Sequence, residues 1–248
     1  MQLANKVAVI TGGASGIGLA ITQLFASNGA HVHVLELNEN VTIDAEGDVK
    51  IHQCNVANQS QVNQVLESIV KEHDIDILVN NAGIAHVGKI ENTNEEDMDR
   101  LYNVNIKGVF NCIKGSLDSL KKTKGVILNM ASIASSIGIP DRFAYSMTKG
   151  AVLTMTYSVA KDYLADGIRC NCISPARVHT PFVDGFIAKN YPGQEKEMFE
   201  KLSKSQPIGR MGKPSEIAEL ALFLCSDKAG FITGTDYPID GGFIKLSN

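Results

Sequence analysis

The stretch VAVITGGASGIGLAITQLF at residues 7–25 decides the fold. An apolar run typical of a strand leads into a glycine-rich turn, and apolar residues at helical spacing follow. Gly12, Gly16 and Gly18 allow the backbone to turn tightly and to approach a bound group closely. The helix that begins near Gly16 points its free N–H groups at the turn, where they can bind phosphate. Three glycines alone are typical of any structural turn, but between a strand and a helix they predict a dinucleotide-binding unit.

The rest of the chain alternates short apolar runs with longer helical patterns. Strands are expected at 6–10, 31–37, 49–53, 76–80, 125–130, 168–173 and 237–239. Helices are expected at 16–28, 60–73, 95–120, 143–165 and 214–226. The strand segments are apolar almost throughout, as in strands buried on both faces. Because right-handed crossovers join parallel strands, this order predicts an α/β fold with helices on both faces of a parallel sheet. Without a linker rich in Pro, Gly or Ser, residues 1–248 form one domain.

Composition excludes several classes of protein. Hydrophobic residues make up 44% of the chain and charged residues 20%, which is typical of a globular protein. A net charge of −4 argues against binding nucleic acid, which needs a basic face. We expect no membrane association, because no apolar run approaches the roughly 20 residues of a membrane span. Five cysteines, an odd number without zinc-ligand spacing, indicate reduced thiols and no metal. These features predict a soluble cytoplasmic protein.

Two segments depart from the alternation. Residues 38–48 are too short and too polar for a full crossover helix. Residues 180–206 hold two short amphipathic pieces separated by a Pro-Gly break. This second segment leaves the carboxyl end of a strand, where ligands bind in open parallel sheets. It is therefore predicted to be a substrate lid.

Glu36 indicates which dinucleotide is bound. It ends the second predicted strand, 18 residues after Gly18. A carboxylate there can accept hydrogen bonds from both ribose hydroxyls, and it repels a 2′-phosphate. No arginine or lysine lies between Gly12 and Lys50 to pair with such a phosphate. The residue favours NAD over NADP, the alternative being a solvated glutamate at a strand end.

Several ordered motifs together resemble the short-chain dehydrogenase/reductase family. The resemblance implies a Rossmann-type doubly wound sheet of seven strands, hydride transfer with a nicotinamide cofactor and, commonly, a homotetramer built on the helices near 95–120 and 143–165. The match runs nearly end to end and comprises TGGASGIG at 11–18, NNAG at 80–83, Asn105 in NVNIKG, Ser132 in NMASIAS, YSMTK at 145–149, RCNCISPARVHTPF at 169–182 and DGGF at 240–243.

The resemblance also implies roles for individual residues. The family's catalytic positions fall on Asn105, Ser132, Tyr145 and Lys149. Its cofactor positions fall on Gly12, Ser15, Gly16, Ile17, Gly18, Glu36, Asn55, Val56, Asn81, Ala82, Gly83, Tyr145, Lys149, Pro175, Val178 and Thr180. Asn55 stands where the family usually has an aspartate against adenine, and its side-chain oxygen can still accept that hydrogen bond. Pro175-Ala176 replaces the usual Pro-Gly.

Tyr145 and Lys149 lie four residues apart on a predicted helix, so they face the same way. A tyrosine followed by lysine at this spacing is more often a core aromatic with a surface lysine. With Ser132 upstream and a cofactor loop present, we expect a catalyst instead. The lysine ammonium and the ring of oxidised nicotinamide should together lower the phenol pKa by about 2–3. Tyr145 then takes the substrate's hydroxyl proton, and Ser132 holds the same oxygen. The family resemblance implies that Asn105 binds a water that links Lys149 to solvent.

Two arginines point to an anionic substrate. Arg142 lies three residues before Tyr145, and Arg177 lies in the loop expected over the nicotinamide. Arginine binds carboxylates strongly, which favours a hydroxy acid or a sugar acid. Some family members that act on hydroxybutyrate or deoxy-keto sugar acids are similar around this tyrosine. Ordinary surface ion pairs are the alternative.

Two other functions remain open from the sequence. A 3-oxoacyl-[acyl-carrier-protein] reductase shares these motifs, but it commonly uses NADPH, which Glu36 disfavours. It would also need a basic patch to dock its acidic carrier. A non-catalytic NAD-binding regulator would be expected to have lost part of the catalytic set, which is complete here.

Overall fold

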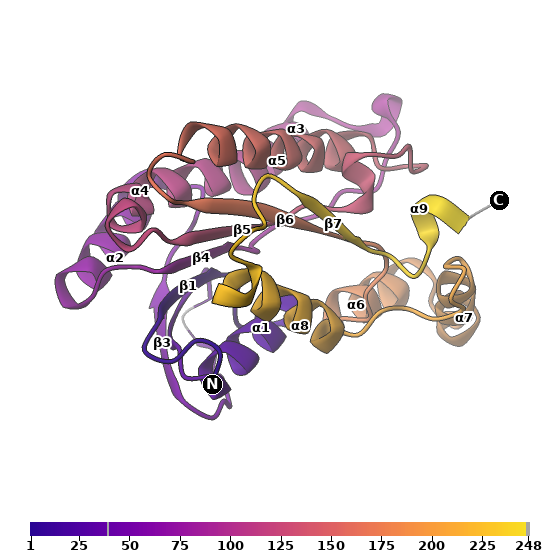
Figure 1. Cartoon of the computed structure of the whole chain (residues 1–248). Coiled ribbons are helices and arrows are strands. Elements are labelled where there is room, and N and C mark those ends of the chain that lie inside the picture. Colours follow the sequence, from indigo (N-terminus) through magenta and orange to yellow (C-terminus); the bar gives the residue numbers. More distant parts are fainter. Residues whose placement is uncertain (39, 247–248) are drawn as a thin grey trace.

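In the computed structural model, which describes residues 1–38 and 40–246, the chain is built around one parallel sheet (Figure 1). The seven strands lie in the order β3-β2-β1-β4-β5-β6-β7. They are β1 (Val7–Thr11), β2 (His31–Glu36), β3 (Asp48–Gln53), β4 (Ile77–Asn80), β5 (Val126–Met130), β6 (Arg169–Pro175) and β7 (Asp236–Ile239). Each predicted strand is present, with bounds that differ by at most two residues. The predicted Rossmann-type doubly wound fold is confirmed.

Helices cover both faces of this sheet (Figure 1). One face carries α1 (Gly16–Ser27) and α8 (Pro214–Cys225), and the other carries α2 (Gln59–Glu72), α4 (Gly108–Thr123) and α5 (Phe143–Asp162). The amphipathic pattern of α2 explains its placement, because its buried residues are Val62, Leu66 and Ile69, at spacings of four and three. Each face has its own buried apolar cluster. The strand order reverses between β1 and β4, which is where ligands bind in such folds.

Shorter elements lie at the edges of the sheet. They are η1 (Ile90–Asn92), α3 (Glu95–Leu101), η2 (Tyr102–Lys107), η3 (Ile133–Ser135), α6 (Pro181–Asn190), α7 (Glu195–Lys204), η4 (Asp227–Ala229) and α9 (Phe243–Leu246). The described residues of 38–48 form no helix, as expected, while residue 39 lies outside the described part. The helical stretch expected over 95–120 is present, and the backbone stays helical from Glu95 to Thr123. That region divides into α3, the π-helical turn η2 and α4, because the side chain of Asn105 in η2 bonds to neighbouring elements.

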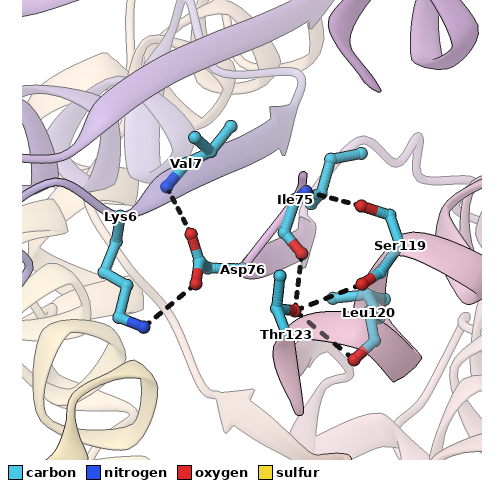
Figure 2. A network of polar contacts seen from close by, with 7 residues as sticks. All are labelled: Lys6, Val7, Ile75, Asp76, Ser119, Leu120 and Thr123. Atoms are coloured by element: carbon cyan, nitrogen blue, oxygen red, sulfur yellow. Dashed lines mark hydrogen bonds and ion pairs between the residues drawn. The ribbon is translucent and has the colours of Figure 1, made fainter. Parts of the chain in front are cut away.

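At the amino ends of β1 and β4, a set of polar contacts fixes the strands in place (Figure 2). Asp76 accepts hydrogen bonds from Lys6 Nζ and from the Val7 N–H, both at 2.9 Å. Ser119 Oγ on α4 accepts a hydrogen bond of 2.7 Å from the Ile75 N–H. These contacts join β1, β4 and α4 at one end of the sheet. The opposite, carboxyl ends of the same strands carry the candidate site.

Three further properties of the structure concern membranes, metals and cysteines. Within residues 1–38 and 40–246, no helix combines the length and the apolar character needed to cross a membrane. The same residues contain no group of three His, Cys, Asp or Glu side chains placed to hold a metal ion. All five cysteines are buried free thiols, including Cys170 and Cys172 on β6.

Candidate active site

The glycine-rich loop between β1 and α1 lies at the carboxyl end of β1. Gly12 and Gly16 have φ values of 61° and 53°, in the left-handed region that favours glycine. A Cβ atom on Gly18 would overlap the Gly12 carbonyl oxygen, so α1 packs directly on the loop. Ser15 precedes α1, and among the described residues its side chain caps no N–H group of the helix. The first N–H groups of α1 therefore fit an anionic group such as a pyrophosphate.

The loop after β4 is bonded to the glycine-rich loop. Asn81 Nδ2 donates to the carbonyl oxygens of Thr11 and Gly12, at 3.1 and 2.9 Å. Thr11 Oγ1 accepts hydrogen bonds from the N–H groups of Asn81 and Ala82, at 3.0 and 2.9 Å. The two loops are close as well as bonded, because a Cβ atom on Gly12 would lie 3.0 Å from Ala82 Cα. They form one wall beside the predicted catalytic residues.

Glu36 places a carboxylate at the edge of the glycine-rich loop. Its Oε2 accepts a hydrogen bond of 3.3 Å from the Ala14 N–H, and its Oε1 accepts one of 3.0 Å from the Leu37 N–H. These bonds fix the carboxylate at the end of β2. This carboxylate is the group from which the sequence predicts NAD over NADP.

Asn55 lies in the turn between β3 and α2, and its side chain is part of that turn. Asn55 Oδ1 accepts a hydrogen bond of 3.0 Å from the Ala57 N–H, and the Asn55 N–H donates to Gln61 Oε1 at 2.9 Å. The oxygen that was expected to face adenine is therefore already bonded to the backbone. Val56, the next residue, is buried, and its carbonyl oxygen accepts a hydrogen bond from Asn111 Nδ2.

A cavity of about 320 Å³ opens beside these loops. The predicted cofactor residues that line it are Ile17, Asn81, Gly83, Tyr145, Lys149, Pro175, Val178 and Thr180. The remaining ones lie outside its lining, at the carboxyl ends of β1 to β4, and are Gly12, Ser15, Gly16, Gly18, Glu36, Asn55, Val56 and Ala82. The structure thus brings the predicted cofactor residues to one edge of the sheet.

Ser132 and Tyr145 meet in this cavity. Ser132 follows β5, and its buried Oγ accepts a hydrogen bond of 3.2 Å from the Ala134 N–H. Tyr145 lies in the first turn of α5, and the neighbouring Ser132 side chain acts to lower the pKa of its hydroxyl. Both side chains line the cavity, so one substrate oxygen can contact both.

Lys149 lies one turn further along α5, and the structure changes its expected effect on Tyr145. Its buried Nζ donates a hydrogen bond of 2.7 Å to the Met130 carbonyl oxygen and lies 5.9 Å from the centroid of the Tyr145 ring. Burial lowers the pKa of Lys149 to about 8. Burial also raises the pKa of Tyr145, against the opposing effects of the Ser132 hydrogen bond and the Arg142 charge. Because Lys149 loses its proton before the phenol does, Lys149 alone does not lower the phenol pKa as expected.

Asn105 is buried in the π-helical turn η2. Its Oδ1 accepts a hydrogen bond of 2.8 Å from the Ile84 N–H. Its Nδ2 donates to the Ile84 carbonyl oxygen and to Thr148 Oγ1, at 2.9 and 3.0 Å. A Cβ atom on Gly83 would lie 3.3 Å from Asn105 Oδ1 and 3.4 Å from Lys149 Nζ, so all three residues are neighbours. The side chain of Asn105 therefore joins the loop after β4 to α5 beside Lys149.

The two arginines that were expected to bind substrate both line the cavity. Arg142 Nη1 donates a hydrogen bond of 3.3 Å to the His86 carbonyl oxygen, and Arg177 Nε donates one of 3.1 Å to Ser205 Oγ. Burial lowers the pKa of both, and the charge of Arg142 lowers the pKa of Arg177 further. In the described part of the chain neither forms an ion pair, whereas Arg100 and Arg210 do. The cavity therefore holds two guanidinium groups without an ion-pair partner in the described structure, and the charge of Asp141 acts on one of them, Arg142.

Sequence reasoning missed the apolar wall of the cavity. Its large side chains come from three separate segments and are Ile139, Phe182, Phe186, Leu202, Met211 and Phe243. Phe182 and Phe243 end quoted family motifs, and Phe186 and Leu202 lie in the predicted lid, but no signal in the sequence pointed to Ile139 or Met211. Gly241 and Gly242 have φ values of 59° and 87°, and the turn they form brings Phe243 to the cavity.

Comparison with known proteins agrees with this geometry. Residues 12–244 match the family model described as enoyl-(acyl carrier protein) reductase. The 3-oxoacyl-[acyl-carrier-protein] reductase FabG of Thermotoga maritima is 37% identical over 253 residues, which cover 98% of this chain and 100% of that protein. Dehydrogenase/reductase SDR family member 6 of Rattus norvegicus is 38% identical over 247 residues, 98% of each chain. The solved structure of L-sorbose reductase from Gluconobacter frateurii, complexed with NADPH and L-sorbose, has a TM-score of 0.92 at 29% identity, covering 99% of this chain and 100% of that one.

Fold and comparisons together define an oxidoreductase that acts on CH–OH groups. The chain belongs to the short-chain dehydrogenase/reductase family. A nicotinamide cofactor is typical of this family.

Proposed function

We propose that the chain is an NAD-dependent oxidoreductase that interconverts a secondary alcohol and a ketone on a hydroxy acid or a sugar acid. The observation that carries this proposal is the cavity shared by Tyr145, Ser132, Arg142 and Arg177. A proton-transfer group and an oxygen-binding group lie beside two guanidinium groups without ion-pair partners among the described residues. Guanidinium groups bind carboxylates through charge-assisted hydrogen bonds. The substrate acid supplies the missing negative charge.

The reaction follows from the arrangement of the side chains. In the oxidation direction Tyr145 accepts the hydroxyl proton, and in reduction it returns that proton to the ketone oxygen. Ser132 Oγ donates a hydrogen bond to the same oxygen and holds it in place. When bound, NAD supplies the hydride acceptor and a positive charge, and a positive charge beside a phenol lowers its pKa. Lys149, with a pKa of about 8, then passes the proton on through a water held near Asn105.

The choice of NAD over NADP rests on Glu36. Its carboxylate is bonded to the glycine-rich loop, and no lysine or arginine between Gly12 and Lys50 offsets its charge. The NADPH complex of L-sorbose reductase shows that relatives with this fold can bind the phosphorylated cofactor. In the present chain the Glu36 carboxylate supports NAD rather than NADP.

We further propose that the single catalytic domain over residues 1–248 closes over substrate with residues 180–206. Phe182 and Phe186 on α6 and Leu202 on α7 line the cavity from this segment. In Figure 1 both helices lie beyond the carboxyl end of the sheet. A segment that covers a ligand in this way fits a lid.

A homotetramer and a cytoplasmic location complete the proposal. Phe110 on α4 and Met147 and Tyr157 on α5 are exposed apolar side chains on the helices where the family usually assembles. The free thiols support a reducing compartment such as the cytoplasm.

The second candidate function is that of a 3-oxoacyl-[acyl-carrier-protein] reductase. The match to the Thermotoga maritima protein of that name favours it. Glu36 and the two unpaired arginines favour a free acid and NAD instead. A non-catalytic regulator is disfavoured because Ser132, Tyr145 and Lys149 all line the same cavity, as catalysis needs.

An absorbance screen for reduced nicotinamide tests the proposal. NAD and NADP are each assayed against hydroxy acids, sugar acids, polyols and a 3-oxoacyl thioester. We expect the highest kcat/KM for an acid with NAD, and about a tenfold higher KM for that acid in Arg142→Ala, because a charge-assisted hydrogen bond is lost. Arg100→Ala, which removes an exposed arginine paired with Asp97, should leave that KM unchanged. Preference for the thioester with NADPH would overturn the proposal.

A further inference from the structure

A second cavity, of about 430 Å³, adjoins the first. We call it the outer cavity; it is lined by Ala85, His86, Val87, Arg142, Phe182, Gly185, Phe186 and Lys189. Four of these residues, namely Ala85, Arg142, Phe182 and Phe186, also line the cavity that contains Tyr145. The two spaces therefore share a wall, and Arg142 faces both of them. A molecule held near Tyr145 can extend past Arg142 into the outer cavity.

The outer cavity carries uncompensated positive charge. In the described part of the chain no aspartate or glutamate lines either cavity. Lys189 on α6 has no ion-pair partner among those residues. Asp141 forms no ion pair with Arg142, but its charge acts on Arg142 and raises the pKa of that side chain. His86 also lines this cavity, but its Nδ1 lies 3.7 Å from Asp97 Oδ2, so an acidic side chain is already close to it. Arg142 and Lys189 are thus the two charges that an anion in the outer cavity would meet.

Arg142 has hydrogen-bonding capacity to spare. A guanidinium has five N–H donors, of which the described structure uses one, from Nη1 to the His86 carbonyl oxygen. Arg177 remains on the inner side, held by Ser205 Oγ. One acid group beside Arg177 would leave most of the Arg142 donors and the exposed Lys189 ammonium without an anionic partner. Two acid groups, one in each cavity, would satisfy all three residues.

We propose that the outer cavity binds a second anionic group of the substrate, placed between Arg142 and Lys189 and away from the reacting carbon. This inference rests on the proposed function and deepens it. The substrate class becomes a hydroxy acid with two acid groups, one near Arg177 and the other in the outer cavity. The second group is an oxyanion, either a carboxylate or a phosphate ester, since both accept charge-assisted hydrogen bonds from arginine and lysine.

The test compares substrates that differ in the second acid group. The probes are β-hydroxybutyrate, with one carboxylate, β-hydroxyglutarate, with two, and 3-phosphoglycerate, with a carboxylate and a phosphate. NAD-linked oxidation of each is measured for the wild type, for Lys189→Gln and for the control Lys196→Gln. Lys196 is an exposed lysine of α7 that lines neither cavity.

We expect a doubly acidic probe to have the highest kcat/KM, and whichever of the two it is identifies the oxyanion. Lys189→Gln should raise its KM about tenfold, the loss of one charge-assisted hydrogen bond, with kcat unchanged. Lys189→Gln should leave the KM of the singly acidic probe unchanged, and Lys196→Gln should leave the KM of every probe unchanged. An equal effect of Lys189→Gln on all probes, or none on any, would overturn the inference and leave the proposed function standing. Failure to oxidise any acid in this set or in the screen would overturn both.

Discussion

Replacing Tyr145 with phenylalanine is expected to lower kcat for alcohol oxidation by about 10³-fold, the range in which a general acid–base group contributes. The variant keeps the ring that lines the cavity and loses only the hydroxyl whose pKa Ser132 lowers. No other side chain of the site can take its place, because Lys149 Nζ is bonded to the Met130 carbonyl oxygen. The fall is measured as the ratio of wild-type to variant kcat in steady-state oxidation of the acid that has the highest kcat/KM in the screen.

Two controls separate catalysis from folding. Tyr157→Phe removes a hydroxyl from the same helix, at an exposed position outside the cavity lining, and should leave kcat unchanged. Binding of NAD to Tyr145→Phe, measured by titration calorimetry, and the Tm of that variant should match the wild type. A variant that binds NAD normally and retains more than about a tenth of the wild-type kcat would contradict a role of this size.

Ser132→Ala is expected to have the second largest effect, a fall in kcat of about 10²-fold, comparable to the loss of one oxyanion-binding donor. The Oγ of Ser132 is buried and accepts the Ala134 N–H, which leaves its own proton for the Tyr145 hydroxyl or the substrate oxygen. The hydrogen bond from Ser132 also lowers the pKa of Tyr145. The pH profile of oxidation should therefore move to higher pH in the variant.

Ser136→Ala is the matched control for this substitution. Its Oγ donates to the Ile133 carbonyl oxygen, and it does not line the cavity. It should change neither kcat nor the pH profile. If Ser132→Ala lowered kcat without moving the profile, Ser132 would bind the substrate oxygen but have no effect on the phenol.

The fold could be predicted because the signals that determine it are local. The apolar strands, the amphipathic face of α2 and the glycine turn at Gly12 each depend on residues close together in the chain. The ordered family motifs likewise identified Ser132, Tyr145 and Lys149, which the structure brings together in one cavity. The π-helical turn at Tyr102–Lys107 had no such signal, because it depends on the contacts of Asn105 with Ile84 and Thr148.

The electrostatics of the site could not be predicted in the same way. Spacing on a helix showed that Lys149 lies on the same helix face as Tyr145. The order in which the two groups lose protons depends on how deeply each is buried. For Arg142 and Arg177 the sequence indicated location only. The lack of an ion pair for either in the described residues depends on segments distant in the chain, as does the placement of Lys189 beside Arg142.

The central claim is that the Tyr145 phenol exchanges the substrate proton once a positive charge lies beside it. Tyrosinate absorbance, recorded as the difference between wild type and Tyr145→Phe during a pH titration, tests this directly, because the chain has six tyrosines and no tryptophan. Without cofactor, burial predicts a midpoint above the ordinary phenol pKa. With oxidised NAD we predict a midpoint lower by about 2–3, as expected for a neighbouring cation. A midpoint that oxidised NAD leaves unchanged would contradict the account.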